Sequence, residues 1–415
     1  MRARVLGVGA GGTRTVIAGL LALALAGCGG TPKLLQNSSS QSTVTIGIPS
    51  KTPKAAQKLG FPILATKNTT RVAGADPIAD AAGVALAVYP SAAPGTHPAA
   101  VTLASSDDWP AAIAASVLMA PPIRAPVLLS GSGSLPTATA DALTTLAPTG
   151  SGSAGGAQLI RVGSVPTVSG LHAAAIKGTN PYALAAGIDR FASAVAGRPS
   201  TDVVIASTSA PAYAMPAAGW AAESGNPVLF VNSSGVPAAT QQALLAHQKA
   251  HIYVLGPPSV ISDAILTQLR RYGAVKRVGA RGPASNSVAF ATYRDPPCAF
   301  GQPCAHVPNS FGWALRSPGH GYVLLNSSRP LDAAAAAGLS GSGTYGPDLL
   351  LSDPSTLPKP VLNYFLDYAT PGFTEEGPTV AVYNHAWLIG GQSAMAVSVQ
   401  AEVDRLLEPV AQSSK

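Results

Sequence analysis

The sequence predicts an α/β protein built from three repeated open-sheet units, and three observations support that prediction. Apolar residues come in continuous runs of four or five, which are typical of parallel strands covered on both faces. An alanine-rich stretch of helical length follows most of these runs, in the strand–helix order of right-handed crossovers. Three kinds of segment recur in the same order along the chain, which indicates internal repetition.

The N-terminus has the features of a bacterial lipoprotein signal. Its first fourteen residues contain three arginines and no acidic residue, and the apolar run at 16–26 is shorter than the ~20 residues that span a bilayer. The run ends in Leu-Ala-Gly-Cys, which looks like a bacterial lipobox. We therefore expect a signal peptide at 1–27 and a diacylglyceryl anchor on Cys28, which would hold the chain at the outer face of the cytoplasmic membrane, within the cell wall. An ordinary secretory signal with a chance cysteine is the alternative.

The composition between the signal and the first repeat indicates a spacer. Residues 28–68 are polar and irregular, with a serine-rich run at 38–42, so we expect a flexible tether. The formal charge of +7 falls to +4 when the three signal arginines are removed, and charged residues make up 11% of the chain. That excess is far below the basic density of a nucleic-acid-binding protein, so no nucleic acid is expected among the partners.

The first recurring segment is a short apolar run followed by an alanine-rich helix, and it begins each repeat. Its apolar markers Val72, Ile176 and Val278 lie 104 and 102 residues apart. The boundaries that follow are module 1 at 69–174, module 2 at 175–276, module 3 at 277–409 and a short tail at 410–415.

The second segment is a strand, a turn of small polar residues and another alanine-rich helix, closed by a second strand and a proline-led helix. The third segment is a strand, a glycine turn and a helix whose N-cap is expected to be a serine. The second segments lie at 101–119, 203–223 and 322–340, their closing strands start at Pro126, Pro227 and Pro347, and the third segments lie at 159–176, 252–269 and 387–407, with Ser169, Ser262 and Ser398 as expected caps.

Module 3 is stretched by a Pro/Gly-rich insertion that contains Cys298 and Cys304. A neighbouring pair of cysteines in an exported protein favours a disulfide, which would pin this surface loop. A metal site with His306 is the alternative, but it needs two more ligands and none is obvious nearby. We therefore expect neither a metal ion nor another cofactor.

The fixed order of these motifs resembles the cell-wall-binding repeat 2 family of bacterial surface proteins, over about residues 69–409. The matching motifs are R-x-x-G at Arg71 to Gly74, part of D-A-L at Asp108 and at Asp332-Ala333, P-(I/V)-L-L at Pro126 to Leu129, and the glycine turn at Gly390-Gly391 with Ser398. Module 2 departs from the pattern with Tyr213 in place of the aspartate, and Gly163 and Gly256 stand alone in their turns. The resemblance implies Rossmann-like modules in a pseudo-threefold arrangement that bind anionic wall polymers without a covalent bond.

Ligands of open α/β sheets bind beyond the carboxyl ends of the strands, at helix N-termini, where hydroxyl and N–H groups suit phosphate or sugar. Helix capping by the same serine and aspartate side chains is the alternative. A basic cluster at the junction of modules 2 and 3 could also meet a polyanion, although scattered arginines on a solvated surface are ordinary. The candidate polymer-binding residues are Ser105, Ser106, Asp107, Ser207, Ser209, Asn326, Ser328 and Arg329 at the turns, and Arg271, Arg277 and Arg281 in the basic cluster.

The sequence therefore predicts a non-catalytic protein that binds anionic wall polysaccharide or a teichoic-type polymer and bridges membrane and wall. A solute-binding lipoprotein of a transporter is the alternative, although such proteins usually have two lobes. A wall-modifying enzyme is a third reading, but acidic residues are few and no Gly-x-Ser-x-Gly motif is present. His247 and His251 have the spacing of a helical zinc pair, but His251 begins an apolar run expected to be a strand.

Overall fold

The computed structural model describes residues 63–295, 311–313, 320–342, 346–369 and 384–408. All of them belong to one compact unit, Val44–Lys415. The predicted signal peptide, the anchor cysteine Cys28, the predicted disulfide of Cys298 and Cys304, and the tail lie outside the described residues. No helix in this described part is long and apolar enough to cross a membrane.

The described strands form three sheets, and the strands are parallel except where β1 meets β2. The first sheet has the order β4-β3-β5-β6, the second β10-β9-β7-β8 and the third β1-β2-β13-β11-β12. The bounds are β3 Val101–Ser105, β4 Val127–Ser130, β5 Leu159–Val162, β6 Ala173–Ile176; β7 Asp202–Ser207, β8 Val228–Val231, β9 His251–Leu255, β10 Ala274–Val278; and β1 Ile63–Ala65, β2 Thr69–Val72, β11 His320–Asn326, β12 Asp348–Leu351, β13 Asn384–Ile389. These parallel sheets with flanking helices confirm the predicted α/β class.

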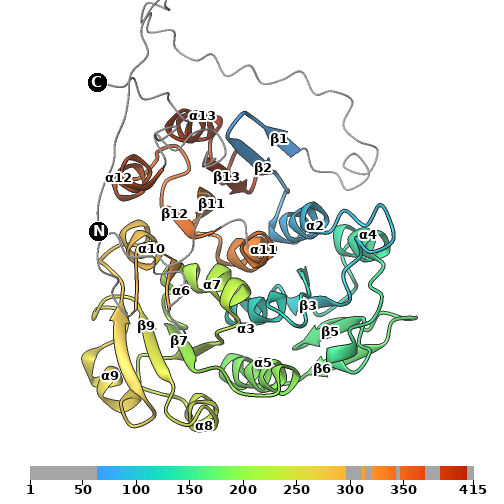
Figure 1. Ribbon diagram of the computed structural model, residues 1–415, viewed down its shortest axis with the longest axis vertical. Helices are drawn as coiled ribbons and strands as arrows, with labels where there is room; N and C mark the ends of the chain where they lie inside the picture. The colour runs from blue at the N-terminus through green and yellow to red at the C-terminus, as the bar shows by residue number, and fades with distance from the viewer. Residues whose placement is uncertain (1–62, 296–310, 314–319, 343–345, 370–383, 409–415) are drawn as a thin grey trace, which may run out of the picture. The chain divides into compact units, whose positions relative to one another are not determined.

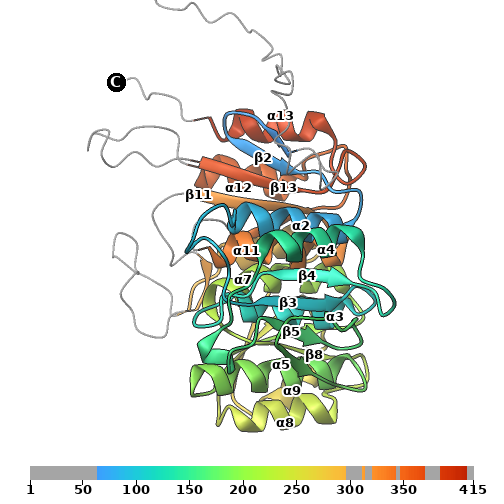
Figure 2. The ribbon, with the colours of Figure 1, turned by 90° about the vertical axis from the view of Figure 1, so that its right-hand side faces the viewer.

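A strand lies at the start of each predicted module and joins the sheet of the preceding repeat, and the predicted boundaries at 175 and 277 fall inside β6 and β10. The markers Ile176 and Val278 end β6 and β10, which pair with β5 and β9. Val72 ends β2, which pairs with β13 near the end of the chain (Figure 2). The residues of β2 therefore complete the third sheet, and the sheets are out of step with the sequence repeat by one strand.

Three linker helices, α2 (Pro77–Val88), α5 (Pro181–Ala196) and α10 (Pro283–Ala291), connect successive sheets. Each starts with proline at its first turn, where a missing N–H costs no hydrogen bond. Asp76 and Asn180 cap α2 and α5 by accepting backbone N–H groups. The three helices pack in turn against the edge strands β4, β8 and β12, so they occupy matching places in the three repeats.

The helices that follow the middle strands β3, β7 and β11 pack against one another at the centre of this unit (Figure 1). They are α3 (Trp109–Ala115) with the 3₁₀ turn η1 (Ser116–Met119), α6 (Pro211–Ala214) with α7 (Pro216–Ser224), and α11 (Pro330–Gly341). Their alanines and glycines let the backbones approach closely, since a Cβ on Gly341 would lie 2.5 Å from Met119 Cγ. All residues from Asp332 to Gly341 are buried, which explains the absence of a polar face on this helix.

The outer helices are α4 (Thr137–Leu146), α8 (Ala238–Ala246), α9 (Asp263–Leu269), α12 (Lys359–Tyr368) and α13 (Val397–Leu406), with a 3₁₀ turn η2 at Gly152–Ala154. Ser262 caps α9 as expected, through its Oγ and the N–H of Ile265. The other two expected caps are wrong: Ser398 is the second residue of α13, and Ser169 precedes no helix. In module 1 the chain after β5 stays in turns because Pro166 and the left-handed Gly170 (φ 79°) interrupt it.

Candidate functional site

The turns after the middle strands have the same construction in all three sheets. In each turn, the buried side chain at the strand end accepts a hydrogen bond from the backbone N–H two residues later. The pairs and their distances are Asp107 N to Ser105 Oγ at 3.2 Å, Ser209 N to Ser207 Oγ at 3.2 Å, and Ser328 N to Asn326 Oδ1 at 2.9 Å. The strand-end side chains Ser105, Ser207 and Asn326 therefore shape the turns from inside.

The middle residue of each turn is bound to the neighbouring strand. Its N–H donates to the last carbonyl of that strand, from Ser106 to Ser130 at 2.9 Å, from Thr208 to Val231 at 3.0 Å and from Ser327 to Leu351 at 2.8 Å. The third side chain of each turn, Asp107, Ser209 or Ser328, is exposed. These three side chains are the part of the predicted turns that stands in solvent, where a ligand could meet them.

A glycine turn lies beside each of these turns, at the end of β5, β9 or β13. Gly163, Gly256 and Gly390 have φ values of 74°, 123° and 100°, a region that side chains disfavour. Their N–H groups donate to the last carbonyls of the incoming strands, at Ile176, Val278 and Val72, over 3.0, 2.9 and 2.8 Å. The glycine turns therefore fasten each incoming strand to the sheet that receives it.

Arg71, the arginine of the family-like motif, lies inside the third glycine turn and has no exposed surface. Its guanidinium donates to the carbonyls of Gly390 at 3.1 Å and Met395 at 2.7 Å, and to Gln400 Oε1 at 2.8 Å. Two further contacts reach the carbonyls of Gly391 and Ala396. Burial lowers the pKa of Arg71 to about 10, against the opposing effect of Asp80. This side chain ties the first described repeat to the last and is not free to bind a ligand.

Arg277 occupies the matching place in the second sheet, since it pairs in register with Val254 as Arg71 does with Leu388. It donates to the carbonyls of Gly256 at 2.7 Å and Ile261 at 2.8 Å. Its Nη2 also lies 2.8 Å from Asp263 Oδ1. Arg277 thus holds a glycine turn rather than presenting a free charge.

In the first sheet the corresponding residue is Ala175, and the arginine stands opposite it as Arg161 on β5. Arg161 donates to the carbonyl of Val165, inside the turn of Gly163. A guanidinium therefore reaches into each of the three glycine turns. In the second and third sheets it comes from the incoming strand, whereas in the first sheet it comes from β5, the strand that leads into the turn. Arg71, Arg161 and Arg277 therefore hold the glycine turns in place through hydrogen bonds to backbone carbonyls.

A cluster of three ionisable side chains lies at the carboxyl edge of the third sheet. Arg329 Nη2 is 2.8 Å from Asp80 Oδ2, and Arg329 Nε is 2.5 Å from Asp332 Oδ2. Both carboxylates are fully buried, whereas the arginine side chain is 20% exposed. Burial and then the charge of Asp332 raise the pKa of Asp80 to about 8, and burial raises that of Asp332 to about 6. The two carboxyls share one guanidinium, so Arg329 carries no surplus positive charge when both are ionised.

The edges of the other two sheets differ chemically at the matching helix positions. The position of Asp80 is occupied by Leu184 in the first sheet and by Asn286 in the second. The position of Arg329 is occupied by Asp108 and Ala210, and that of Asp332 by Ala111 and Tyr213. Tyr213 accepts the N–H of Gly282 at 2.9 Å through its hydroxyl oxygen. The three edges share a backbone geometry but would not bind the same ligand group.

The predicted basic cluster at the junction of modules 2 and 3 divides into fixed and free residues. Arg277 holds its glycine turn, and the neighbouring Lys276 is paired with Asp295. Arg271 and Arg281 are exposed, and no carboxylate among the described residues pairs with them. Within that described part, no group of three or more His, Cys, Asp or Glu side chains could hold a metal ion.

Residues 175–266 match the family model described as cell wall binding domain 2 (CWB2). This match confirms the resemblance to that family in the segment that makes up most of module 2. No curated protein matches the sequence of this chain.

Two solved structures are similar in fold. Cwp8 from Clostridium difficile matches with a TM-score of 0.59 and 15% identity over 82% of this chain and 52% of its own. Cwp6 from Clostridium difficile matches with a TM-score of 0.61 and 15% identity over 82% of this chain and 48% of its own. The chain spans about half the length of each of these proteins, and the similarity at this identity shows a shared fold.

Proposed function

We propose, from the match of residues 175–266 to a cell wall binding domain 2, that this chain binds a cell wall polymer without catalysing a reaction on it. That match is the observation on which the proposal rests. The fold similarity to Cwp8 and Cwp6 from Clostridium difficile supports it, because each of these proteins matches 82% of this chain. The role that we propose is attachment at the bacterial surface.

The polymer that we propose is anionic, a polysaccharide or a teichoic-type chain. The sequence after the predicted signal carries a formal charge of +4, which gives attraction to a polyanion over some distance. The exposed side chains Arg271 and Arg281 are available for direct charge-assisted hydrogen bonds. Ser209 offers an exposed hydroxyl at a strand end, whereas the exposed Ser328 Oγ already donates to Asn326 Oδ1 and is left to accept. Asp107 would repel an anionic group and suits only a sugar hydroxyl.

A pull-down on purified wall sacculi tests this proposal. Protein comprising residues 29–415 should be retained on intact sacculi at physiological salt, and much less on sacculi stripped of their anionic polymers. A protein of the same size and net charge from another fold serves as the control for nonspecific attraction. Equal retention of the control, or no retention of this chain, would contradict wall binding.

We further propose that a lipid on Cys28 holds the chain to the membrane, so that it bridges membrane and wall. The lipobox-like sequence Leu-Ala-Gly-Cys at 25–28 supports this. Cys28→Ala should move the protein from the membrane fraction into the medium and abolish incorporation of labelled palmitate. If wild-type protein takes up no palmitate, the anchor proposal fails while wall binding stays open to its own test. The three described sheets give no support to a two-lobed, solute-binding alternative.

A further inference from the structure

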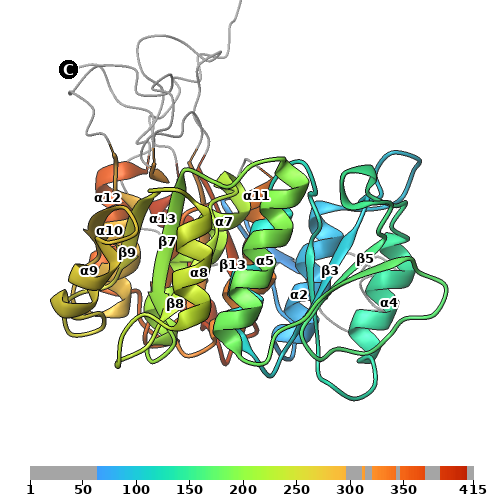
Figure 3. The ribbon, with the colours of Figure 1, turned by 90° about the horizontal axis from the view of Figure 1, so that it is seen from below.

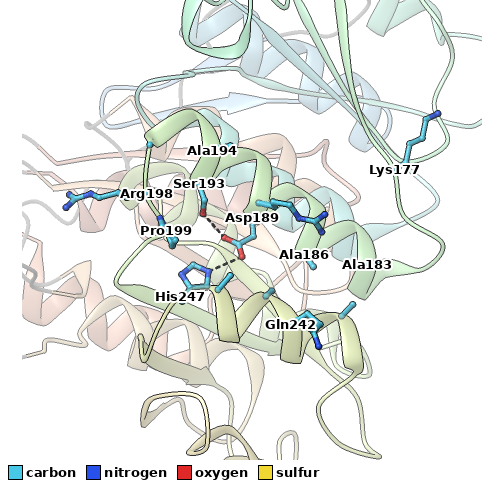
Figure 4. A pocket seen from close by; sticks show the side chains of 15 residues that line it. Lys177, Ala183, Ala186, Asp189, Ser193, Ala194, Arg198, Pro199, Gln242 and His247 are labelled. Atoms are coloured by element: carbon cyan, nitrogen blue, oxygen red, sulfur yellow. Dashed lines mark hydrogen bonds and ion pairs between the residues drawn. The ribbon is translucent and has the colours of Figure 1, made fainter.

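A groove of about 810 Å³ lies between helices α5 and α8, inside the segment that matches the wall-binding family model. Figure 3 shows the two helices side by side, and Figure 4 shows the side chains that line the space between them. None of the predicted polymer-binding residues lines this groove. It is therefore a second, independent place where module 2 could meet a ligand.

The groove exists because small side chains face each other across the two helices. Both faces repeat alanine at helical spacing, so neither helix fills the space between them. The alanines are Ala183, Ala186 and Ala194 on α5, and Ala239, Ala243 and Ala246 on α8. At 1.5 Å per residue, the eleven steps from Ala183 to Ala194 give a groove about 16 Å long. Methyl groups along such a floor suit the C–H faces of sugar or polyol units.

A buried ion pair lies in the wall of the groove. Asp189 Oδ2 is 2.9 Å from His247 Nε2, and His247 Nδ1 is 2.7 Å from the carbonyl oxygen of Ser200. The side chains of Asp189 and His247 are 6% and 1% exposed. Burial alone would lower the pKa of His247, but the hydrogen bond with Asp189, the charge of Asp189 and the hydrogen bond with the carbonyl of Ser200 together raise the pKa. The pair holds the C-terminal end of α8 against α5, so the groove has a fixed polar end.

Cations line the rim of the groove. Lys177, Arg190 and Arg198 are exposed, and none of them pairs with a carboxylate among the described residues. Figure 4 shows Lys177 and Arg198 at opposite ends of the groove. Three unpaired cations along an open groove favour a ligand with several negative charges over a neutral one.

The matching helices of the other modules do not reproduce this combination. Counted from the helix starts, the place of Asp189 and Arg190 is taken by Ala85 and Leu86 in α2. The place of Ala243 is taken by Tyr364 in α12, where a large ring stands instead of a methyl group. The charged rim, the ion pair and the alanine floor therefore come together in module 2.

We propose that the groove between α5 and α8 binds a segment of a polyanionic sugar or polyol chain. Arg190, Arg198 and Lys177 pair with its phosphate or carboxylate groups, and arginine can do so with two parallel hydrogen bonds. Ser193 and Gln242 bind its hydroxyl groups, while the alanine methyls contact its carbon skeleton. This inference rests on the proposed wall-binding function and gives that function a specific site.

Two kinds of variant test the groove in the chain 29–415. Arg190→Ala with Arg198→Ala removes two rim charges, and Arg294→Ala with Arg405→Ala removes two exposed charges elsewhere as the matched control. Ala246→Trp blocks the groove from an exposed position without changing charge, and Thr145→Trp places the same ring at the equivalent position of α4. Thermal unfolding establishes that each variant is folded.

Binding is measured to sacculi and to three defined polymers, namely a glycerol-phosphate oligomer, a polyuronate and neutral dextran. We expect both groove variants to lose about tenfold or more in affinity for sacculi and for one of the two polyanions, and both controls to change less than twofold. The polyanion whose affinity falls in the groove variants shows whether the groove binds phosphate or carboxylate groups. Neutral dextran should not bind to the wild-type protein.

The outcomes separate the two proposals. If wild-type protein binds sacculi and folded groove variants bind equally well, the groove inference is wrong and wall binding stands. If charge variants and their controls lose affinity equally, the attraction is nonspecific and the groove is again excluded. If wild-type protein does not bind sacculi, the proposed function fails, and the groove inference fails with it as a wall site.

Discussion

Replacement of Arg71 by methionine should reduce stability more than the equivalent change at any of the other glycine turns. Arg71 is fully buried and donates to three buried acceptors, the carbonyls of Gly390 and Met395 and Gln400 Oε1. Methionine can fill the space but donates to none of them. The turn after β13 would then hold several buried oxygens without a partner.

The size of the effect follows from two opposing terms. Three unsatisfied buried acceptors at roughly 1–3 kcal/mol each cost about 6 kcal/mol in total. Burial of the guanidinium lowers the pKa of Arg71 from 12.5 to about 10, and relief from that burial returns roughly 3 kcal/mol. The net loss in the free energy of unfolding is therefore about 3 kcal/mol for Arg71→Met.

Arg277→Met is the matched comparison, because Arg277 donates to the carbonyls of Gly256 and Ile261 as Arg71 donates to those of Gly390 and Met395. Its side chain is 18% exposed, so water can replace part of what is lost, and we expect a cost of about 1 kcal/mol. Urea unfolding of both variants and the wild type, with the slope compared between them, measures the two losses. Equal losses in the free energy of unfolding at the two positions would refute the argument that the full burial of Arg71 makes it more important for stability.

Three further predictions test the packing. Gly390→Ala should cost about 2 kcal/mol of stability by thermal unfolding, because φ is 100° and the new Cβ would lie 2.6 Å from Ala394 Cβ. In the control Gly391→Ala the new Cβ meets nothing closer than 3.6 Å, so this change should be nearly neutral. Similar losses for the two variants would count against the strain argument. Burial raises the pKa of Asp348 from 3.8 to about 8, so the folded chain retains a proton that the unfolded chain releases, and stability should fall as pH rises from about 4 to 8. Asp80 and Asp332, whose pKa values are raised to about 8 and about 6, contribute to the same fall. Asp348→Asn should therefore reduce the slope of Tm against pH in that window without removing it, and an unchanged slope would exclude this group as a cause. A fragment of residues 175–266 should show no cooperative thermal transition, because it lacks β10 and keeps only the last two residues of β6 without their partner β5. A sharp transition would mean that the repeat folds alone.

The sequence pattern predicted the strands well because a buried parallel strand is visible as a continuous apolar run. The spaced markers Val72, Ile176 and Val278 each end a strand. The pattern could not tell which sheet receives these strands, because an edge strand has the same apolar composition in the sheet before it or after it. A sequence repeat gives a period and leaves the point of division between structural units undefined.

The candidate site was less visible in the sequence, because its partners are far apart along the chain. Arg71 was recognised as part of a motif, yet its role depends on Gly390, 319 residues away. Arg277 was predicted to face a ligand, and its distance of 2.7 Å to the carbonyl of Gly256 shows an internal role instead. Asp80 was missed, although a single carboxylate within an alanine-rich helix was a signal of a buried charge partner.

The groove of module 2 was hidden for a different reason. Alanines at helical spacing on α5 and α8 read as two ordinary core-facing stripes, and the two helices do meet. Whether such stripes close on one another or leave space depends on the separation of the helix axes. The sequence spacing raised His247 as a zinc ligand, whereas in the structure its Nε2 is hydrogen-bonded to Asp189 Oδ2.

The pairing of β2 with β13 limits how many repeats such a chain can contain. An open solenoid grows by adding copies and needs modified end repeats to cover its exposed faces. Among the described residues, the last sheet is completed by the first strands, so each of the three sheets receives a strand from another repeat. A fourth copy inserted in tandem would separate β13 from β2 unless every angle between neighbouring units changed.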